Sequence, residues 1–256
     1  VLTYFLDAVM QEFIDKAEGT EFMERAVQFA RRHRAIGIGA LGWHSYLQDN
    51  MIAFDSAEAM RKNAEFFQHI ESESYKASEE LAERLGEPEV MEGYGRRNAT
   101  TMAVAPTKSS SFILGQVSAS IEPIKSNYYV TDRAKIKTVY RNPYLEDLLE
   151  EKGKNNRDTW DSIELHNGSV QHLDFLSDEE KEVFKTFQEI SQLAVVRQAA
   201  QRQQWIDQSQ SINITVDPSQ VPIKDINKLH IEAWRSGMKS LYYQNNVNAA
   251  QEFARE

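Results

Sequence analysis

A chain of 256 residues is long enough to bury a full hydrophobic core, as one large domain or two small ones. Hydrophobic residues make up 41% of it and charged residues 27%, a balance typical of a globular protein. The net charge of -10 argues against non-specific binding to nucleic acid or to an anionic membrane, so we expect neither DNA nor a membrane as a partner.

Composition also restricts the chemistry. The sequence contains no cysteine, which excludes disulfides, thiol chemistry and cysteine-type zinc sites within it. The six histidines are scattered without ligand spacing, so no metal site is predicted. There is neither a run of about 18 apolar residues nor a charged-then-apolar leader, which favours a cytoplasmic setting. The chain starts with Val1 and is helical in pattern at once, so we interpret its start as a point within a domain.

The first third of the chain is predicted to be mainly helical. Apolar residues recur at helical spacing over 1–14, and a second helix is expected over 20–32 with Thr20 as its cap. Asp55 followed by Glu58 is typical of a capping box, which predicts a long charged helix over 55–85 that ends at Gly86.

A glycine-rich stretch at 35–42 matches the spacing of a dinucleotide-binding fingerprint. That fingerprint requires a long apolar strand before its first glycine, whereas here the basic end of a helix precedes Ala35. We therefore prefer a short strand whose glycines permit close packing or a tight turn.

The stretch most indicative of function lies at 94–123. Residues 100–105 are apolar and uncharged, as in a strand buried on both faces, and Phe112, Ile113 and Val117 recur at helical spacing. Between them, 106–111 gathers hydroxyl groups and unpaired N–H groups at a helix N-terminus, which predicts a phosphate-binding loop. An ordinary serine N-cap is the alternative.

The remainder alternates strands and helices, which predicts an α/β fold, as part of a barrel or of a parallel sheet wrapped by helices. The expected elements are strands at 128–130 and 136–140, a polar surface insertion that ends at Gly168, a helix over 177–209 with one break and a capping box at Ser177, a strand at 211–216, a helix at 225–235 and a short strand at 239–244.

Six segments, taken together and in order, resemble the C-terminal half of the class I ribonucleotide reductase large subunit. They are 34–39, 97–100, 106–111, 121–123, 205–209 and 241–245, of which the last contains the distinctive Tyr-Tyr-Gln-Asn run. The resemblance implies that residues 1–256 are a partial domain, the C-terminal half of a ten-stranded α/β barrel with helices outside. It also implies a role in reducing ribonucleoside diphosphates at C2′ by a thiyl radical mechanism, for DNA synthesis.

The resemblance assigns two sets of site residues. Pro106, Thr107, Lys108, Ser109 and Ser110 would bind the substrate diphosphate, although many relatives have Glu at the Lys108 position.

Tyr242 and Tyr243 match the tyrosine pair that passes a radical from the small subunit to the active-site cysteine. The alternative for this pair is two core aromatics that face opposite sides of a strand.

The missing cysteines determine the expected partners. In relatives the catalytic cysteines and the Asn and Glu that handle protons lie upstream, and a redox pair lies downstream, so this chain alone cannot perform the reaction. The implied partners are the N-terminal half of the large subunit, a metal-containing small subunit that supplies the radical, and thioredoxin or glutaredoxin. No cofactor is expected in this chain.

Two further readings stay open at this point. The chain could be an independent α/β protein that binds a phosphate or nucleotide through 109–111. It could also be a non-catalytic helical interaction module, which a lack of strand structure at 100–105 would support.

Overall fold

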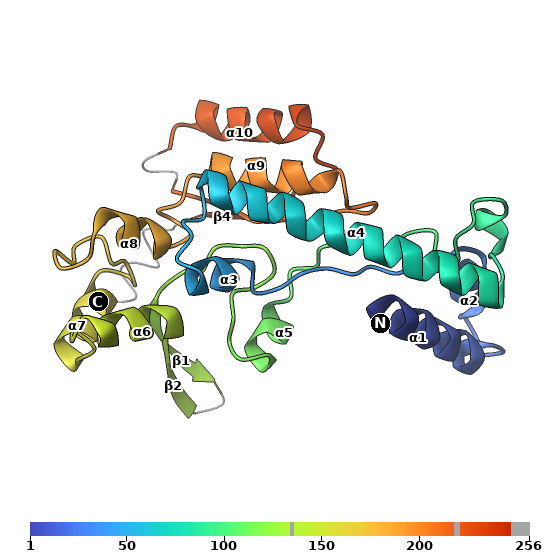
Figure 1. Cartoon of the computed structure of the whole chain (residues 1–256), viewed down its shortest axis with the longest axis horizontal. Helices are drawn as coiled ribbons and strands as arrows, with labels where there is room; N and C mark the ends of the chain where they lie inside the picture. The colour runs from blue at the N-terminus through green and yellow to red at the C-terminus, as the bar shows by residue number, and fades with distance from the viewer. Residues whose placement is uncertain (134–135, 218–220, 247–256) are drawn as a thin grey trace.

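The computed structural model describes residues 1–133, 136–217 and 221–246. Helices dominate the described chain (Figure 1). Their bounds are α1 Leu2–Ala17, α2 Glu24–His33, α3 Trp43–Asp49, α4 Ala57–Leu85, α5 Lys108–Ile113, α6 Pro143–Glu151, α7 Arg157–Leu165, α8 Asp178–Val183, α9 Gln192–Gln203 and α10 Ile223–Arg235, with a 3₁₀ turn at Glu89–Met91. None of the described helices combines the length and the apolar content that crossing a membrane requires.

Four extended segments run parallel and side by side through the middle of the molecule. Ile38 bridges Met102, Val104 bridges Gln210, and strand β3 (Ile214–Val216) pairs with β4 (Gln244–Asn246). The segments 36–38, 100–104, 208–216 and 242–246 therefore form one open strip. The chain is α/β, and no closed barrel is formed among the residues that the structure describes.

The 100–104 segment is paired on both sides, as its apolar sequence predicts. Ile38 N–H donates to the Thr101 carbonyl at 2.8 Å on one side, and Val104 N–H donates to the Ser209 carbonyl at 3.1 Å on the other. Met102 and Val104 are buried. The presence of this ladder argues against a purely helical interaction module.

The glycines at 37 and 39 permit close packing rather than cofactor binding. A Cβ at Gly39 would lie 2.3 Å from the Ala103 carbonyl oxygen, and one at Gly37 would lie 2.9 Å from the Ala103 Cβ. Atoms of Ala103 occupy this space, which confirms the close packing, while the predicted short strand is reduced to a single bridge at Ile38.

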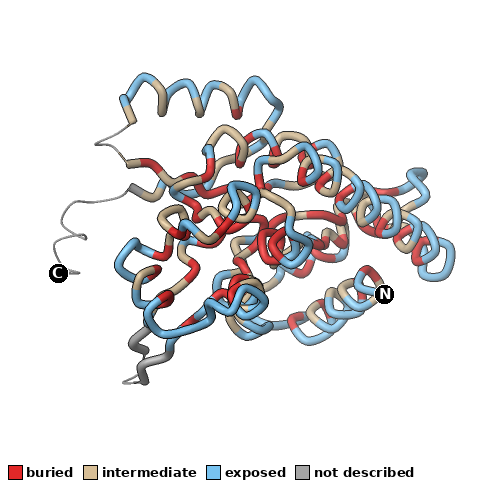
Figure 2. The backbone as a smooth tube through the Cα atoms, turned by 60° about the vertical axis from the view of Figure 1, so that its left-hand side comes forward, coloured by how far each residue is buried: buried red, intermediate tan, exposed pale blue. Residues whose placement is uncertain are grey.

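Helices cover one side of the strip. The long helix α4 crosses the molecule, α9 packs beside it, and α10 packs on α9 (Figure 1). Buried segments concentrate toward the middle of the molecule, as Figure 2 shows. The core there includes Trp43, Leu47, Phe67, Met102 and Phe187.

A second core lies among α6, α7 and α8. Leu145, Leu149, Trp160 and Ile163 are fully or almost fully buried and pack with Val183. The prediction of a polar surface insertion up to Gly168 was wrong, because the segment forms two short amphipathic helices, and its Asn and Lys residues lie at their ends and in the loops beside them. The two strands predicted at 128–130 and 136–140 are confirmed as β1 Tyr128–Arg133 and β2 Ile136–Arg141, which pair antiparallel.

Some predicted boundaries were also wrong. Helix α2 begins at Glu24, not after a Thr20 cap, and α4 is capped by Ser56, whose hydroxyl accepts from Ala59 N–H, not by Asp55. The capping box at Ser177 and the break predicted within 177–209 are both confirmed, but the second of the two helices ends at Gln203 and not at Ser209.

A buried ionic network attaches α1 to the strip. Arg34 and Arg97 both donate to the Asp7 carboxylate, at 2.8 and 3.0 Å, and Asn98 donates to it at 3.2 Å. Burial opposes ionisation of Asp7, but the hydrogen bonds and charges of the two arginines lower its pKa below the ordinary value. The network fixes α1 beside the start of the 100–104 segment.

Candidate functional site

The predicted phosphate-binding loop leaves the end of the 100–104 segment and opens α5. Thr107 has φ 42°, in the left-handed region, and precedes the first helical residue, Lys108. Ser111 N–H makes the first intrahelical bond, to the Thr107 carbonyl at 2.9 Å. The N–H groups of residues 108–110 therefore have no acceptor within the helix, and Ser109 and Ser110 are exposed beside them.

The alternative prediction, an ordinary serine N-cap on this helix, is wrong. The capping position is Thr107, and its side chain makes no capping bond. Its hydroxyl oxygen accepts instead from Ser120 N–H at 2.8 Å. This bond ties the loop to the 118–122 segment and leaves the helix N-terminus open.

A buried carboxylate stands next to this loop. Glu122 is 3% exposed and accepts a hydrogen bond from the Asn213 side-chain amide. Burial raises the pKa of Glu122, while the positive charges of Lys108 and Lys125 act in the opposite direction. Lys108 therefore lies close enough for its charge to reach the Glu122 carboxylate.

The tyrosine pair lies on the other side of that carboxylate. The ring centres of Tyr242 and Tyr243 are 4.1 Å apart with their planes at 54°, and the residues are 50% and 56% exposed. The hydrogen bond and charge of Tyr243 raise the pKa of Tyr242. The alternative, two buried aromatic side chains that face opposite sides of a strand, is wrong, because these rings are half-exposed and contact each other.

The structure brings the loop and the tyrosine pair to the same end of the strip. Val104 pairs with Gln210, and Ile214 pairs with Gln244. Along the 208–216 segment, the residues that follow Val104 and those that precede Gln244 are therefore in similar register. Tyr243 N–H donates to the Asn213 side-chain oxygen at 3.0 Å, and Asn213 in turn donates to Glu122. A continuous set of contacts therefore runs from the tyrosines to the carboxylate beside the loop.

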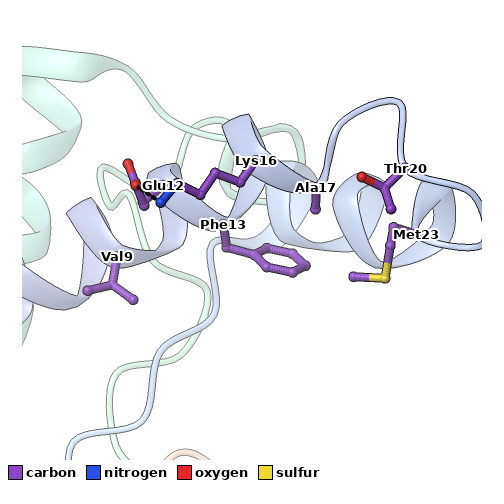
Figure 3. Close-up of a pocket in the computed structure, with 7 residues that line it drawn as sticks. All are labelled: Val9, Glu12, Phe13, Lys16, Ala17, Thr20 and Met23. Atoms are coloured by element: carbon purple, nitrogen blue, oxygen red, sulfur yellow. Dashed lines mark ion pairs between the residues drawn. The ribbon is translucent and has the colours of Figure 1, made fainter.

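Two depressions lie elsewhere on the surface. One of about 500 Å³ is lined by α1 and the turn that precedes α2, with Phe13 and Met23 side by side and an ion pair between Lys16 and Glu12 (Figure 3). Another of about 770 Å³ lies between α5 and the β1–β2 hairpin. Neither is lined by any predicted site residue. No cluster of potential metal ligands occurs within the described ranges.

Comparison with known proteins defines the class of this chain. The family model described as ribonucleotide reductase, barrel domain, matches residues 1–93 and 88–244. The chain belongs to this family, which confirms the resemblance seen in its sequence.

Individual relatives agree. The ribonucleoside-diphosphate reductase large subunit of Invertebrate iridescent virus 3 is 46% identical over 95% of this chain and 38% of that protein. The putative large subunit of Frog virus 3 is 42% identical over 94% of this chain and 43% of its own length. The structure of the Actinobacillus ureae class Id ribonucleotide reductase alpha subunit matches with a TM-score of 0.91 and 59% identity, covering 97% of this chain and 46% of that one. The chain thus spans less than half the length of these relatives.

Sequence reasoning missed Asn213 as a site residue and quoted Glu122 only as part of a motif. Asn213 lies in a predicted strand, where a polar residue is ordinarily assigned to the solvent face. The sequence carries no signal for it, because Asn213 alternates with Ile212 and Ile214 as a solvent-facing residue would, whereas the structure buries all three. A strand that is buried on both faces must satisfy any polar side chain internally.

Proposed function

We propose that this chain is the C-terminal half of the catalytic barrel of a class I ribonucleotide reductase large subunit. The open strip of four parallel segments, covered by helices on one side, fits part of a ten-stranded barrel. Residues 1–256 are then a partial domain. The complete enzyme reduces ribonucleoside diphosphates to deoxyribonucleoside diphosphates in the cytoplasm.

In this proposal, 106–110 binds the substrate diphosphate. The N–H groups of Lys108, Ser109 and Ser110 and the exposed serine hydroxyls offer the donors that phosphate oxygens require, at the positive end of α5. Lys108 adds a positive charge. It would interact with both the bound diphosphate and the Glu122 carboxylate. Pro106 and Thr107 shape the turn.

Tyr242 and Tyr243 conduct the radical. A phenol can lose an electron and a proton together, and a ring separation of 4.1 Å suits a short hop between the two. A tyrosine hydroxyl is protonated at neutral pH, which is the state from which such a transfer starts, and Tyr243 raises the pKa of Tyr242 further. The half-exposed rings are accessible to a partner that delivers the radical.

The rest of the machinery comes from outside this sequence, since it holds no cysteine. The N-terminal half of the large subunit supplies the cysteine that becomes the thiyl radical and the dithiol that provides two electrons. A metal-containing small subunit generates the radical, and thioredoxin or glutaredoxin renews the dithiol. This chain itself requires no cofactor.

The observation that carries the proposal is the contact path from the tyrosine pair through Asn213 to the carboxylate beside the loop. Complementation tests it. The chain alone is expected to be inactive, and mixing it with the separately produced N-terminal half and the small subunit should restore dithiol-dependent reduction. Tight nucleotide binding by the chain alone, with no activity gained on mixing, would instead favour an independent phosphate- or nucleotide-binding protein.

A further inference from the structure

The backbone at the tyrosine pair departs from strand geometry. In a regular strand, consecutive side chains point to opposite faces and consecutive N–H groups point to opposite edges. Here both N–H groups meet the same neighbouring segment. Tyr242 N–H donates to the Ile212 carbonyl at 2.8 Å, and Tyr243 N–H donates to the Asn213 side-chain oxygen at 3.0 Å. Strand β4 begins only at Gln244, immediately after this irregularity.

The irregular backbone accounts for the ring contact. Adjacent side chains on a regular strand would face opposite sides of the sheet, and their rings could not stack. The rings of Tyr242 and Tyr243 are 4.1 Å apart because the chain turns against that alternation. This turn also explains why the final strand is not at 239–244, where the sequence predicted it.

Asn213 supplies the acceptor that this turn needs. Its side chain is fully buried, with 0% exposure, so its amide has no access to water. The oxygen accepts from Tyr243 N–H, and the nitrogen donates to the Glu122 carboxylate, which can only accept. Glu122 therefore fixes which way the amide points, and this hydrogen bond to a carboxylate is of the stronger, charge-assisted kind.

We propose that Asn213, oriented by Glu122, is a positioning residue that holds Tyr243 out of the strand alternation so that its ring meets that of Tyr242. The inference rests on the proposed radical relay and deepens it. Neither Asn213 nor Glu122 touches the reacting atoms. Both act through the backbone N–H of Tyr243.

The test uses the complete large subunit with its small subunit. In Asn213→Ala we expect kcat to fall at least tenfold while KM for the nucleoside diphosphate stays within about twofold, because the relay geometry is lost and the 106–110 loop is not. Glu122→Leu should lower kcat as Asn213→Ala does. Glu122→Gln still offers an oxygen to the Asn213 amide and should retain a kcat within about threefold of the wild type.

A matched control separates positioning from general destabilisation. The Gln192 side-chain oxygen also accepts a hydrogen bond from the backbone of this strip, from Thr215 N–H. This bond does not involve the tyrosines. Gln192→Ala is expected to leave kcat within about twofold. If Gln192→Ala lowers kcat as much as Asn213→Ala does, the positioning role is overturned.

A second readout does not depend on activity. A crystal structure of the large subunit carrying Asn213→Ala should show the ring centres of Tyr242 and Tyr243 clearly farther apart than 4.1 Å. An unchanged ring separation would overturn the proposal.

The kinetics of Tyr242→Phe and Tyr243→Phe, measured alongside, distinguish failure of the radical relay from failure of the positioning role. If both remain active, the relay itself is wrong. If both are inactive while Asn213→Ala keeps full kcat, only the positioning role is wrong.

Discussion

Single buried polar side chains connect backbone segments that are far apart in the sequence. The Asn127 amide donates to the carbonyls of Gly168 and Phe184, and the ring Nδ1 of His44 accepts from Ile124 N–H at 2.9 Å. Each of these side chains is completely buried. In the sequence such residues are indistinguishable from surface residues, since periodicity reports hydrophobic faces and not hydrogen-bond partners. Asn213 escaped notice for this reason.

His44 should make the stability of the chain fall at mildly acidic pH. Burial lowers its pKa to about 3, against an ordinary value of 6.5, although the Val183 carbonyl acts in the opposite direction. Between these values only the unfolded chain binds the proton, so stability is full above about pH 6.5 and is lost as the pH falls toward 3. At pH 5 the loss from this residue is about 2 kcal/mol, at about 1.4 kcal/mol per pKa unit.

Urea unfolding at pH 8 and pH 5 checks this expectation. His44→Asn retains an acceptor for Ile124 N–H but does not titrate. Its unfolding free energy should therefore fall by about 2 kcal/mol less than that of the wild type between pH 8 and pH 5. His230 is exposed, and His230→Asn should keep the wild-type dependence. Equal pH dependence in wild type and His44→Asn would contradict the assignment.

At the level of elements, the sequence predicts those with strong local signals. The charged helix α4, the strands β1 and β2 and the Ser177 capping box were all expected, since each has its own local sequence pattern or cap. Helices α6 and α7 were not, because their few apolar residues are spaced among many polar ones and gain order from packing on α8. The pairing partners of the strip segments were beyond prediction, since they depend on contacts between distant residues.

The tight approach at the 36–38 segment gives a prediction about packing. Gly39→Ala should destabilise the chain by roughly 1–3 kcal/mol, because its Cβ would clash with a backbone oxygen that cannot yield. In Gly37→Ala the added Cβ would lie 2.9 Å from the Ala103 Cβ and 3.3 Å from the Gln208 side-chain nitrogen, so adding Ala103→Gly should partly restore the stability. The same addition should not rescue Gly39→Ala. Denaturation midpoints of the four variants test this, and rescue of both glycine variants would contradict the contact geometry.

The second core gives another prediction. Leu149 in α6 is fully buried, so Leu149→Ala should cost about 2–5 kcal/mol of unfolding free energy. Leu165 in the neighbouring α7 is 82% exposed, and Leu165→Ala should change the unfolding free energy by less than about 0.5 kcal/mol. Similar effects of the two substitutions in denaturant unfolding would indicate that α6 and α7 do not form a packed core.

At the scale of the whole molecule, family membership could be predicted from six short segments in order, although no segment was sufficient by itself. The site could be predicted only in part. The loop at 106–110 and the tyrosine pair carry recognisable residue types, whereas the Glu122–Asn213 connection between them arises from pairing of the 100–104, 208–216 and 242–246 segments. That proximity is a property of the folded strip, and local sequence does not encode it visibly.

The division of labour between the loop and the tyrosines is tested most directly by steady-state kinetics of the complete large subunit with its small subunit. Ser109→Ala combined with Ser110→Ala should raise KM for the nucleoside diphosphate about tenfold or more, because hydrogen bonds to a charged phosphate are lost. Tyr243→Phe should abolish turnover while the substrate dissociation constant stays within about twofold, because only the phenolic O–H is removed. Weakening of substrate binding by Tyr243→Phe to the same extent as by the serine substitutions would contradict the account.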